Sequence, residues 1–411
     1  MEIKNLAQHL STLPAELSAA LSQLKSAAQA GGYRLYIVGG AVRDLLLGLP
    51  ARDIDVVVLG DAISLTKALP RGTGKLTIYP VFGTATISFG SLRLDLSSAR
   101  TESYPRPGAL PTVRHSTLED DISRRDFTIN ALAISLNEDD YGHLIDCCGG
   151  QKDLTAKLIR AMHPKSFSDD PTRIWRAVRY EQRLSFGIEP DTLGWLKKDV
   201  TGLKNISGER LWYELECVLR EDEPEKTLLR LGALGVLAQM RPPIQADNWL
   251  ADKFRGARKR GCHLVPTYLA LLIYRLQSDE AEIFARYLHL GSRLRRILQD
   301  TQAVKAKLPG LSRPNLKPST IYHRLHGHAT EAVEATLVAS TSTHAQRNIA
   351  LYQDKLRMMK TSLKGNDLAN LGVQPGPRVG EIMRELFKAR LDGLVDNRTD
   401  ELALAKSLIA A

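Results

Sequence analysis

The sequence predicts an α+β protein, with a head built on a mixed β-sheet with flanking helices and an all-helical remainder. Short apolar and β-branched runs are concentrated between residues 33 and 146, and after about residue 154 nearly all apolar patterns have helical spacing. The chain has 411 residues, of which 43% are hydrophobic and 25% are charged. These values are typical of a globular protein of about two to four domains.

The expected elements of the head follow the chain in order. A helix over residues 1–32 ends at Gly31 and Gly32, which suit a helix C-cap. Strands are expected at residues 34–38, 53–59, 75–78, 84–89, 92–96 and 131–136, with helices at 42–47 and 62–69. Residues 100–119 are rich in proline and are expected to form a loop.

The remainder of the chain is expected to be helical. Helical spacing of apolar residues is found at 174–182, 208–220, 225–240, 265–276, 281–288 and 345–359. A last unit begins near residue 364 and ends in a helix at 381–391.

Positive charge is concentrated in one later segment. The net charge is +10, and residues 251–320 contain fourteen Lys or Arg against five Asp or Glu, whereas residues 1–150 contain fourteen against sixteen. A polyanion such as nucleic acid is therefore the expected partner, and a basic, well-solvated helical face is the alternative. The candidate RNA-contacting residues are Arg258, Lys259, Arg260, Arg293, Arg295 and Arg296.

The sequence also predicts a compartment. There is no apolar run long enough to span a bilayer, and the N-terminus lacks the basic start and apolar core of a signal peptide. The four cysteines show no Cys-x-x-Cys pair, so we expect free thiols. A cytoplasmic protein is expected, with no membrane partner.

Two carboxylates one residue apart predict a metal site. Asp53 and Asp55 lie in a β-branched run, and alternation along a strand places both side chains on one face. Carboxylates this close repel each other unless a cation lies between them, and Mg²⁺ is the expected ion. A polar strand face is the alternative. Asp95, on a later strand, is a third candidate or an ordinary polar residue.

A Gly-Gly turn precedes these carboxylates. Gly39 and Gly40 allow backbone N–H groups to approach phosphate oxygens, and Arg43 follows at the start of a helix, where anions are favoured. The order of turn and carboxylates predicts a phosphate-binding turn beside a metal site.

Two further motifs suit a nucleotide. Arg124 and Arg125 can reach phosphates, while Asp126 and Asn130 can hold ribose hydroxyls; an N-cap is the alternative for Asp126.

In the second motif, Asp170 and Arg173 are three residues apart on one helical face and match the hydrogen-bonding edge of a base. Helix capping is the alternative for Asp170, because Pro171 follows it. Arg176 and Arg179 continue this face toward phosphates or pair with acids.

The ordered set of motifs resembles the class II tRNA nucleotidyltransferases, which comprise bacterial CCA-adding enzymes and related poly(A) polymerases of the DNA polymerase β superfamily. The set comprises Gly-Gly-x-Val-Arg-Asp (39–44), Asp-x-Asp (53–55), Arg-Arg-Asp-Phe-Thr-Ile-Asn-Ala (124–131), Asp-x-x-Gly-Gly-x-x-Asp-Leu (146–154), Asp-Pro-x-Arg-x-x-Arg-Ala-x-Arg (170–179) and Ile-Ser-Gly-Glu-Arg (206–210). It covers residues 36 to about 220, and the unit from residue 364 resembles the tail of longer members.

The resemblance implies a domain order. After the N-terminal helix (1–32), it implies a polymerase-β-like head or palm (33–154), a helical neck with a base-recognition helix (155–220), a basic helical body (221–330) and a helical tail (331–411).

The resemblance also implies residue roles. It implies that Asp53 and Asp55 bind Mg²⁺, that Asp95 is the third acidic position, and that Asp170 and Arg173 pair with C or A as a protein template. It implies that Arg124 or Arg125 meets the triphosphate and that Asp126 and Asn130 meet the ribose. The family motif usually begins Glu-Asp, whereas here Asp169 stands in the first position, which puts the C-versus-A specificity in doubt.

We therefore expect an enzyme that adds C and A from CTP and ATP to the 3′ end of tRNA, with the basic body contacting the acceptor arm. CC-only addition is a close alternative, because loss of a flexible loop near residues 100–119 accompanies it in this family. A-only addition is a third possible activity, and a poly(A) polymerase or a non-catalytic RNA-binding relative would fit the motifs less well.

Overall fold

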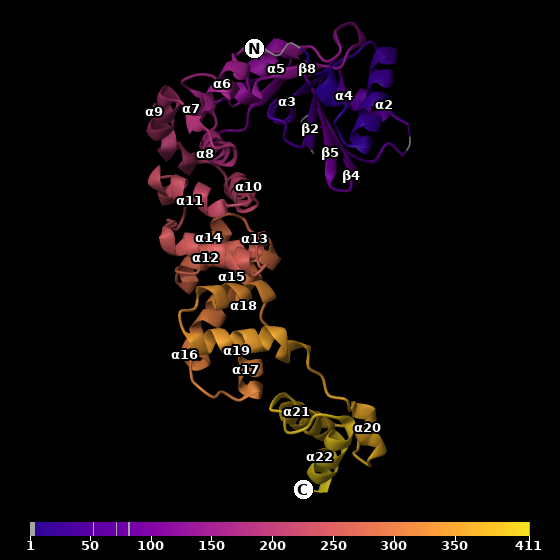
Figure 1. Ribbon diagram of the computed structural model, residues 1–411, viewed down its shortest axis with the longest axis vertical. Helices are drawn as coiled ribbons and strands as arrows, with labels where there is room; N and C mark the ends of the chain where they lie inside the picture. Colours follow the sequence, from indigo (N-terminus) through magenta and orange to yellow (C-terminus); the bar gives the residue numbers. More distant parts are fainter. Residues whose placement is uncertain (1–4, 52, 71, 81–82, 411) are drawn as a thin grey trace. The chain divides into compact units, whose positions relative to one another are not determined.

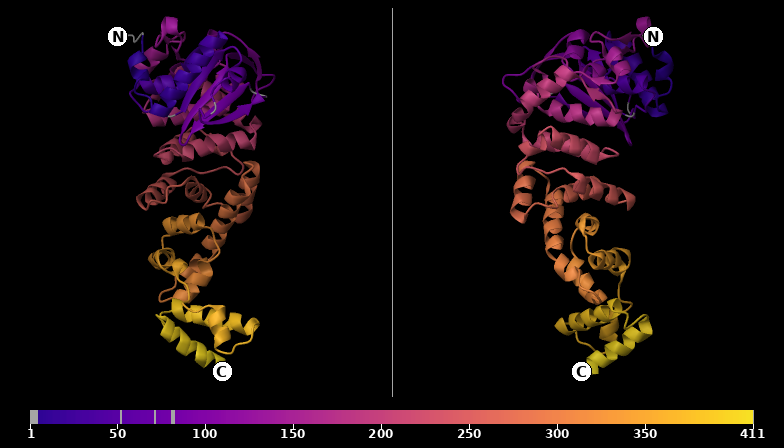
Figure 2. Two further views of the ribbon diagram at one scale, coloured as in Figure 1. Left: turned by 90° about the vertical axis from the view of Figure 1, so that its right-hand side faces the viewer. Right: turned by 60° about the vertical axis from the view of Figure 1, so that its left-hand side comes forward.

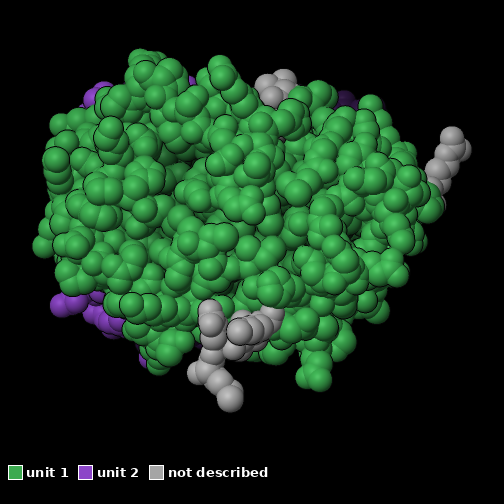
Figure 3. Space-filling view, turned by 90° about the horizontal axis from the view of Figure 1, so that it is seen from above, with its two compact units in different colours: residues 1–215, 233–239 green, residues 216–232, 240–411 purple. Residues whose placement is uncertain are grey.

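The computed structural model describes residues 5–51, 53–70, 72–80 and 83–410. The chain forms two compact units, Met1–Leu215 with Ala233–Gln239, and Glu216–Gly232 with Met240–Ala411 (Figures 1 and 3). Within the described residues, no helix is both long and apolar enough to cross a bilayer.

A seven-stranded mixed sheet organises the first unit, in the order β3-β4-β5-β2-β1-β8-β9. The strands are β1 (Arg34–Val38), β2 (Asp53–Leu59), β3 (Lys75–Tyr79), β4 (Thr84–Phe89), β5 (Leu92–Ser98), β8 (Ala133–Ser135) and β9 (Leu144–Ile145). The β2–β5 pair is parallel, and the other neighbours in this sheet are antiparallel. Helices α2 (Ala15–Gly31), α3 (Gly40–Leu46) and α4 (Ala62–Lys67) pack against it (Figure 2). The predicted fold class is confirmed.

Strand β2 carries the predicted carboxylates because its two faces differ. Ile54, Val56 and Val58 are buried on one face. On the other face, Val57 packs in a core cluster with Leu118 and Ile122 of helix α5 (Leu118–Ser123). Asp53 and Asp55 precede Val57 on that face and are exposed. The alternation predicted from sequence is therefore present, and α5 covers only the part of this face beyond the carboxylates.

The structure differs from the sequence prediction at two segments of the head. The first helix is divided into α1 (Ala7–Leu10) and α2, because Pro14 precedes α2 and lacks the N–H that would continue a helix. The expected loop at 100–119 is wrong at its ends, where β6 (Arg100–Ser103) and β7 (Thr112–His115) form an antiparallel hairpin and α5 begins. The prolines that suggested a loop lie at the tip of this hairpin.

Short helices complete the first unit and lead into the second. They are α6 (Gly150–Ala156), α7 (Ser166–Asp169), α8 (Thr172–Leu184), α9 (Pro190–Asp199) and α10 (Gly208–Leu219). Helix α8 includes the predicted segment 174–182 and carries the Arg173, Arg176 and Arg179 series. Two-residue strands β10 (Leu158–Ile159) and β11 (Gly187–Ile188) pair in parallel.

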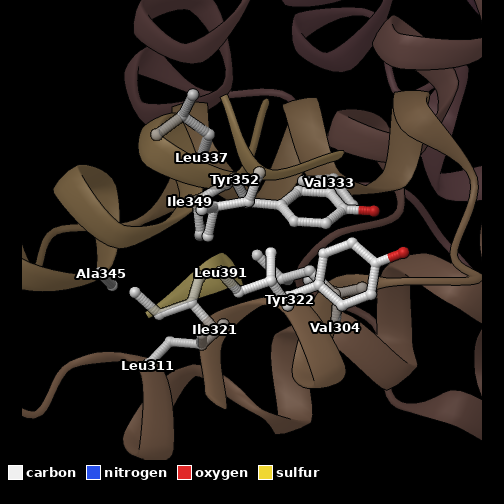
Figure 4. Packing of buried hydrophobic residues seen from close by; sticks show 12 residues of the cluster. Val304, Leu311, Ile321, Tyr322, Val333, Leu337, Ala345, Ile349, Tyr352 and Leu391 are labelled. Carbon is white, nitrogen blue, oxygen red and sulfur yellow. The ribbon is translucent and has the colours of Figure 1, made fainter. Parts of the chain in front are cut away.

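The second unit is helical, as expected. Its elements are α11 (Pro224–Ala233), α12 (Asn248–Lys259), α13 (Val265–Leu272), α14 (Ser278–Tyr287), α15 (Ser292–Ala306), α16 (Leu308–Leu311), α17 (Pro318–Leu325), α18 (Thr330–Ala339), α19 (Thr343–Asp354), α20 (Gly365–Asn370), α21 (Pro377–Leu391) and α22 (Arg398–Ala410). Figure 4 shows one apolar core, in which Tyr322 of α17, Ile349 and Tyr352 of α19 and Leu391 of α21 pack together.

Candidate active site

The pairing register of three strands places the predicted metal and phosphate residues together. Asp55 lies opposite Asp95 of β5 on one side and opposite Val38 of β1 on the other. Val38 is the last residue before Gly39, so the turn begins beside the carboxylate of β2. The long-range pairing thus brings together Gly39, Asp55 and Asp95, of which the first and last are 56 residues apart in sequence.

The Gly39 turn lies beside Asp55, and its backbone conformation and the nearby Arg125 both disfavour a side chain at this position. Gly39 has φ 75° and ψ −138°, a conformation that is essentially restricted to glycine. A Cβ atom here would lie 2.7 Å from Nη1 of Arg125 and 3.6 Å from Oδ2 of Asp55. The glycine therefore leaves room for Arg125 beside the carboxylate.

The two adjacent arginines have different surroundings. Arg125 donates from Nη2 to Oδ2 of the buried Asp121 at 3.0 Å, while its Nη1 lies near Gly39. Arg124 donates to Oδ1 of Asp121 and, at 2.7 Å, to Oε1 of Glu102 on β6. Because α5 ends at Ser123, both arginines follow directly from the helix that packs on the β2 face, but only Arg125 is placed beside the Asp55 carboxylate.

The surroundings of Asp55 favour an added positive charge. Desolvation by the surrounding protein raises the pKa of Asp55, although part of the side chain is open to solvent. Asp95 and Asp53 raise this pKa further, whereas Arg125 and Arg176 oppose the shift. The net shift of the Asp55 pKa is upward, and a bound cation would oppose this shift by stabilising the carboxylate.

Asp95 is near Asp55 but has partners of its own. Its carboxylate accepts hydrogen bonds from Oγ1 of Thr86 and from Nε of Arg93, the latter at 2.9 Å. Within the described part of the chain, no group of three His, Cys, Asp or Glu side chains is arranged to hold a metal ion. Asp95 lies opposite Asp55 in the strand register and adds negative charge beside it.

Asp126, Asn130 and Arg43 form a buried hydrogen-bonded chain. Asn130 Nδ2 donates to Oδ1 of Asp126 at 3.0 Å, and Arg43 Nη1 donates to Oδ1 of Asn130 at 2.7 Å. Arg43 also pairs with Asp44 at 2.7 Å. The structure thus places Arg43, expected at a phosphate, in contact with the predicted ribose-binding amide. The N-cap alternative for Asp126 is not seen, because Phe127 is the N-cap of the short 3-10 helix Thr128–Asn130; Oδ1 of Asp126 instead accepts the N–H of Phe127.

An arginine cluster surrounds the ring of Tyr180 on α8. The guanidinium carbons of Arg43, Arg176, Arg179 and Arg183 lie 4.9, 5.6, 5.2 and 6.0 Å from the ring centroid. Cations over an aromatic face are attracted by its quadrupole. This aromatic ring, which sequence reasoning did not single out, therefore holds together the arginines of two predicted motifs.

Asp170 and Arg173 are brought together at the start of α8, but each already has partners. Asp170 Oδ1 accepts from the N–H of Thr172 at 3.1 Å and from Nη2 of Arg210 at 2.7 Å. Arg173 is buried and donates to the carbonyl of Arg124 at 2.9 Å. Asp170 therefore accepts a backbone hydrogen bond at the start of α8, as the helix-capping alternative predicted, and it also forms an ion pair with Arg210.

The tip of the β6–β7 hairpin is fixed against this pair. Gly108 donates its N–H to the carbonyl of Asp169 at 3.2 Å and accepts from Nη1 of Arg210 at 3.1 Å. Its φ is +74°, and a Cβ atom would lie 3.2 Å from Cδ1 of Ile206. Sequence reasoning assigned no role to Gly108 or Arg210; the only signals were a Pro-Gly turn and the position of Arg210 in a family motif.

The candidate RNA-contacting residues of the second unit differ in whether their side chains are paired within the protein. Arg258 forms a bidentate pair with Glu225, at 2.5 and 3.1 Å, and Arg293 pairs with Glu331 at 2.9 Å. Arg296 donates to the carbonyl of Gly327. The remaining candidates are Lys259, Arg260 and Arg295, of which Lys259 and Arg260 are exposed.

Two family models match the chain. Residues 35–160 match the poly A polymerase head domain, and residues 185–247 match the probable RNA and SrmB-binding site of polymerase A. The sheet, the carboxylates and the Gly39 turn all lie in the first match. Fold and site thus define a polymerase-type nucleotidyltransferase head followed by an RNA-binding segment.

Similar proteins define the family to which this head domain belongs. An A-adding tRNA nucleotidyltransferase of Halalkalibacterium halodurans is 32% identical over 90% of this chain and 88% of the relative. One of Geobacter sulfurreducens is 36% identical over 91% of this chain, which spans only 45% of that relative. The Thermotoga maritima CCA-adding enzyme complexed with tRNA superposes with a TM-score of 0.75 at 28% identity, covering 100% of this chain and 99% of the other. The chain belongs to the tRNA nucleotidyltransferase family.

The names of the relatives differ in the nucleotides that each is said to add. The Deinococcus radiodurans relative, 30% identical over 92% of this chain and 90% of its own, is named CC-adding, and that of Leuconostoc citreum, 29% identical over 97% and 98%, is named CCA-adding. The resemblance inferred from the motifs is confirmed at the level of the family.

Proposed function

We propose that this protein transfers nucleotides from CTP or ATP to the 3′ end of tRNA and releases pyrophosphate. The observation that carries the proposal is the placement of Asp53 and Asp55 on the central strand β2, beside the Gly39 turn and Arg125. Carboxylates for a cation, a guanidinium for phosphate and an open backbone turn are the parts that nucleotidyl transfer requires. A cytoplasmic location is consistent with tRNA as substrate.

Asp53 and Asp55 fit a magnesium ion. Enzymes of this family generally use divalent metal ions. Mg²⁺ is commonly bound by one or two carboxylates together with water and substrate phosphates. Desolvation and the neighbouring Asp95 and Asp53 raise the pKa of Asp55, and such an ion would oppose this shift. When bound, the ion would lower the pKa of the tRNA 3′-hydroxyl and neutralise charge on the phosphates.

The other head residues bind and orient the nucleotide. Arg125 is placed to pair with the triphosphate, and the Gly39 backbone allows phosphate oxygens to approach the carboxylate edge. Asp126 and Asn130 present polar groups for the ribose, and Arg43 fixes the orientation of the Asn130 amide. Arg43 is thereby proposed as a positioning residue, while Arg124 holds the hairpin through Glu102.

Asp170 and Arg173 are proposed to select the base. A carboxylate and a guanidinium at the start of α8 supply an acceptor and donors for the hydrogen-bonding edge of C or A. Arg210, which also donates to the carbonyl of Gly108, holds the Asp170 carboxylate from outside the motif. Arg176 and Arg179 extend the positive charge along the same helix.

Adenosine addition is our first candidate for the product. The relatives named A-adding are 36% and 32% identical to this chain, compared with 30% for the CC-adding and 29% for the CCA-adding relative. CCA addition, which the motifs predicted, is the second candidate, supported by the full-length superposition on CCA-adding enzymes.

One assay separates these products and tests the reaction itself. The purified chain is incubated with Mg²⁺, labelled CTP or ATP, and three tRNA transcripts that end before CCA, after the first two C residues or after the complete CCA. Incorporation of ATP into the second transcript alone indicates A addition, and incorporation of CTP and then ATP into the first indicates CCA addition. Incorporation of neither label into any transcript would reject the proposed reaction and favour a non-catalytic RNA-binding protein.

A further inference from the structure

An open cavity of about 530 Å³ lies within the second unit, which contains none of the predicted nucleotide-binding motifs. Ligand pockets in proteins typically enclose about 300–1,000 Å³. The walls come from α12, the segment after α13, α15, α16 and the α18–α19 connection. Its lining residues include Trp249, Tyr274, Arg275, Lys305, Thr341 and Ser342.

One wall is a stack of flat groups. The rings of Trp249 and Tyr274 are stacked with centroids 6.2 Å apart and an interplanar angle of 29°. The Arg275 guanidinium lies 4.7 Å from the Trp249 ring centroid. Asp247 holds this guanidinium in place with two hydrogen bonds of 2.7 and 3.1 Å. Nζ of Lys253 lies 5.8 Å from the same centroid. The wall is therefore a set of flat, ordered groups of the kind against which nucleic-acid bases pack.

Lys305 provides a site in the same cavity where an anion could bind. Its ammonium group donates to the carbonyls of Tyr274 and Leu276, at 2.7 and 3.1 Å, and both acceptors are neutral. An ammonium group has three donors, so one remains for a ligand. Burial lowers the pKa of Lys305, which a bound anion would reverse. Among the described residues, no carboxylate lines the cavity.

The start of α19 adds further donors at the rim. Ser342 caps this twelve-residue helix by accepting the N–H of Ala345 at 3.2 Å. The first N–H groups of a helix have no partner within the helix, and they favour anions. The Thr341 hydroxyl is exposed beside them. The cavity is thus lined by the Trp249 wall, the Lys305 ammonium group, the first residues of α19 and the hydroxyl-bearing residues Thr341 and Ser342.

We propose that this cavity binds one nucleotide unit, with the base against the Trp249 wall and the phosphate at Lys305 and the start of α19. The unit belongs either to an unpaired stretch of RNA or to a free nucleotide. The first source rests on the proposed function, and it is favoured by the surplus of positive charge over residues 251–320.

Photo-crosslinking of the full chain tests the site directly. The probes are 8-azido-AMP, a five-nucleotide single-stranded RNA with one 4-thiouridine, and a tRNA with the same label, and crosslinked peptides are identified by mass spectrometry. We expect crosslinks to the segments around Trp249, Tyr274 and Thr341. Crosslinking by the RNA probes alone identifies an RNA nucleotide, whereas crosslinking by 8-azido-AMP identifies a free one; either result supports the site.

Two variants act on the cavity in different ways. Trp249→Ala removes the stacking surface. Thr341→Trp fills the cavity from an exposed position, so this variant should fold and can test the site even if Trp249→Ala is unfolded. Each should reduce crosslinking in this unit and the affinity for the crosslinking probe about ten-fold, the scale of one lost stacking contact. Lys305→Met should act likewise, and Lys360→Met, at an exposed lysine outside both the cavity and residues 251–320, is the control.

The result that overturns the proposal is the absence of crosslinks in the second unit, or unchanged probe affinity in a folded Thr341→Trp variant. Crosslinks in the head and incorporation of labelled nucleotide are measured on the same samples. Loss of the cavity crosslink with continued incorporation rejects this site alone. A cavity crosslink without incorporation rejects the proposed reaction alone.

Discussion

Arg176 donates from Nε to Oδ2 of Asp126 at 2.7 Å and so pairs a guanidinium of α8 with a buried carboxylate of the head. The same carboxylate accepts from Asn130 and from the N–H of Phe127. Burial alone would raise the pKa of Asp126, but Arg176, Asn130 and Arg173 outweigh burial and lower this pKa to about 2. The orientation of the predicted ribose-binding pair therefore depends on α8.

The lowered pKa of Asp126 predicts a pH dependence of stability. Because the folded-state value of about 2 lies below the ordinary value of 3.8, the contribution is present above about pH 4 and is lost as the pH falls toward 2. Asp126→Asn should lower the free energy of unfolding by about 2 kcal/mol at pH 7. Urea unfolding at a series of pH values should show this difference shrinking below pH 4. A difference that stays constant down to pH 2 would contradict the assignment, and Asp139→Asn, at an exposed ion pair with Arg34, is the control.

Removing the carboxylate of Asp55 should abolish nucleotide transfer. Asp55→Ala is expected to lower kcat by roughly a hundred- to a thousand-fold or more, because charge stabilisation at the reacting phosphate is lost. Binding of tRNA, measured by fluorescence anisotropy, should change little, since Asp55 lies in the head and adds negative charge there. Full incorporation of labelled nucleotide by this variant would refute the metal assignment. Asp139→Asn again serves as a control that should keep its activity.

A side chain at Gly108 should disturb base selection from outside the motif. Gly108→Ala places a Cβ at 3.2 Å from Ile206 in a left-handed conformation, so the hairpin tip must shift and release Arg210. We expect about a ten-fold rise in KM for the correct nucleotide and a smaller ratio of kcat/KM between ATP and CTP. Gly48→Ala is the matched control, because Gly48 also has a positive φ (+67°) but no atom within 4 Å of the added Cβ. Equal effects of the two substitutions would exclude a specific role of the hairpin.

Adjacent basic residues of α12 should have different effects. Lys259 is exposed, and Lys259→Met should weaken tRNA binding and lower the slope of log K against log salt by about 1, as expected for one phosphate contact. Anisotropy titrations between low and moderate salt measure this slope. An unchanged slope would show that this face does not contact RNA.

Arg258 should affect stability instead. Its guanidinium is paired with Glu225, whose side chain is only 3% exposed, so Arg258→Met would leave a buried carboxylate without a partner. We expect the free energy of unfolding to fall by about 2 kcal/mol, less than for a fully buried pair because Arg258 is partly exposed. Denaturant unfolding measures the change, and the double variant with Glu225→Gln should recover part of it. A stable single variant would mean that the pair contributes little.

The local part of the site could be predicted from sequence, whereas its long-range contacts could not. Alternation in β2 places Asp53 and Asp55 on one face, and the glycine pair ends the first helix as expected. However, periodicity reports which face a residue occupies and says nothing about its partner. The inward position of Arg43 depends on Asn130, 87 residues away, and the role of Arg210 depends on Gly108, 102 residues away. The β6–β7 hairpin was missed because its prolines lie at the turn, where they do not prevent pairing.

The parallel pairing of β2 and β5 has a consequence for how this family can diverge. Asp95 faces Asp55 because β4 and β5 are joined by a two-residue turn, with Phe89 paired to Leu92. Inserting or deleting one residue in that turn would bring Leu94 or Leu96 to the position of Asp95 while the hairpin itself could still form. Length changes at this turn should therefore be rare among active descendants, although the turn contains none of the predicted site residues.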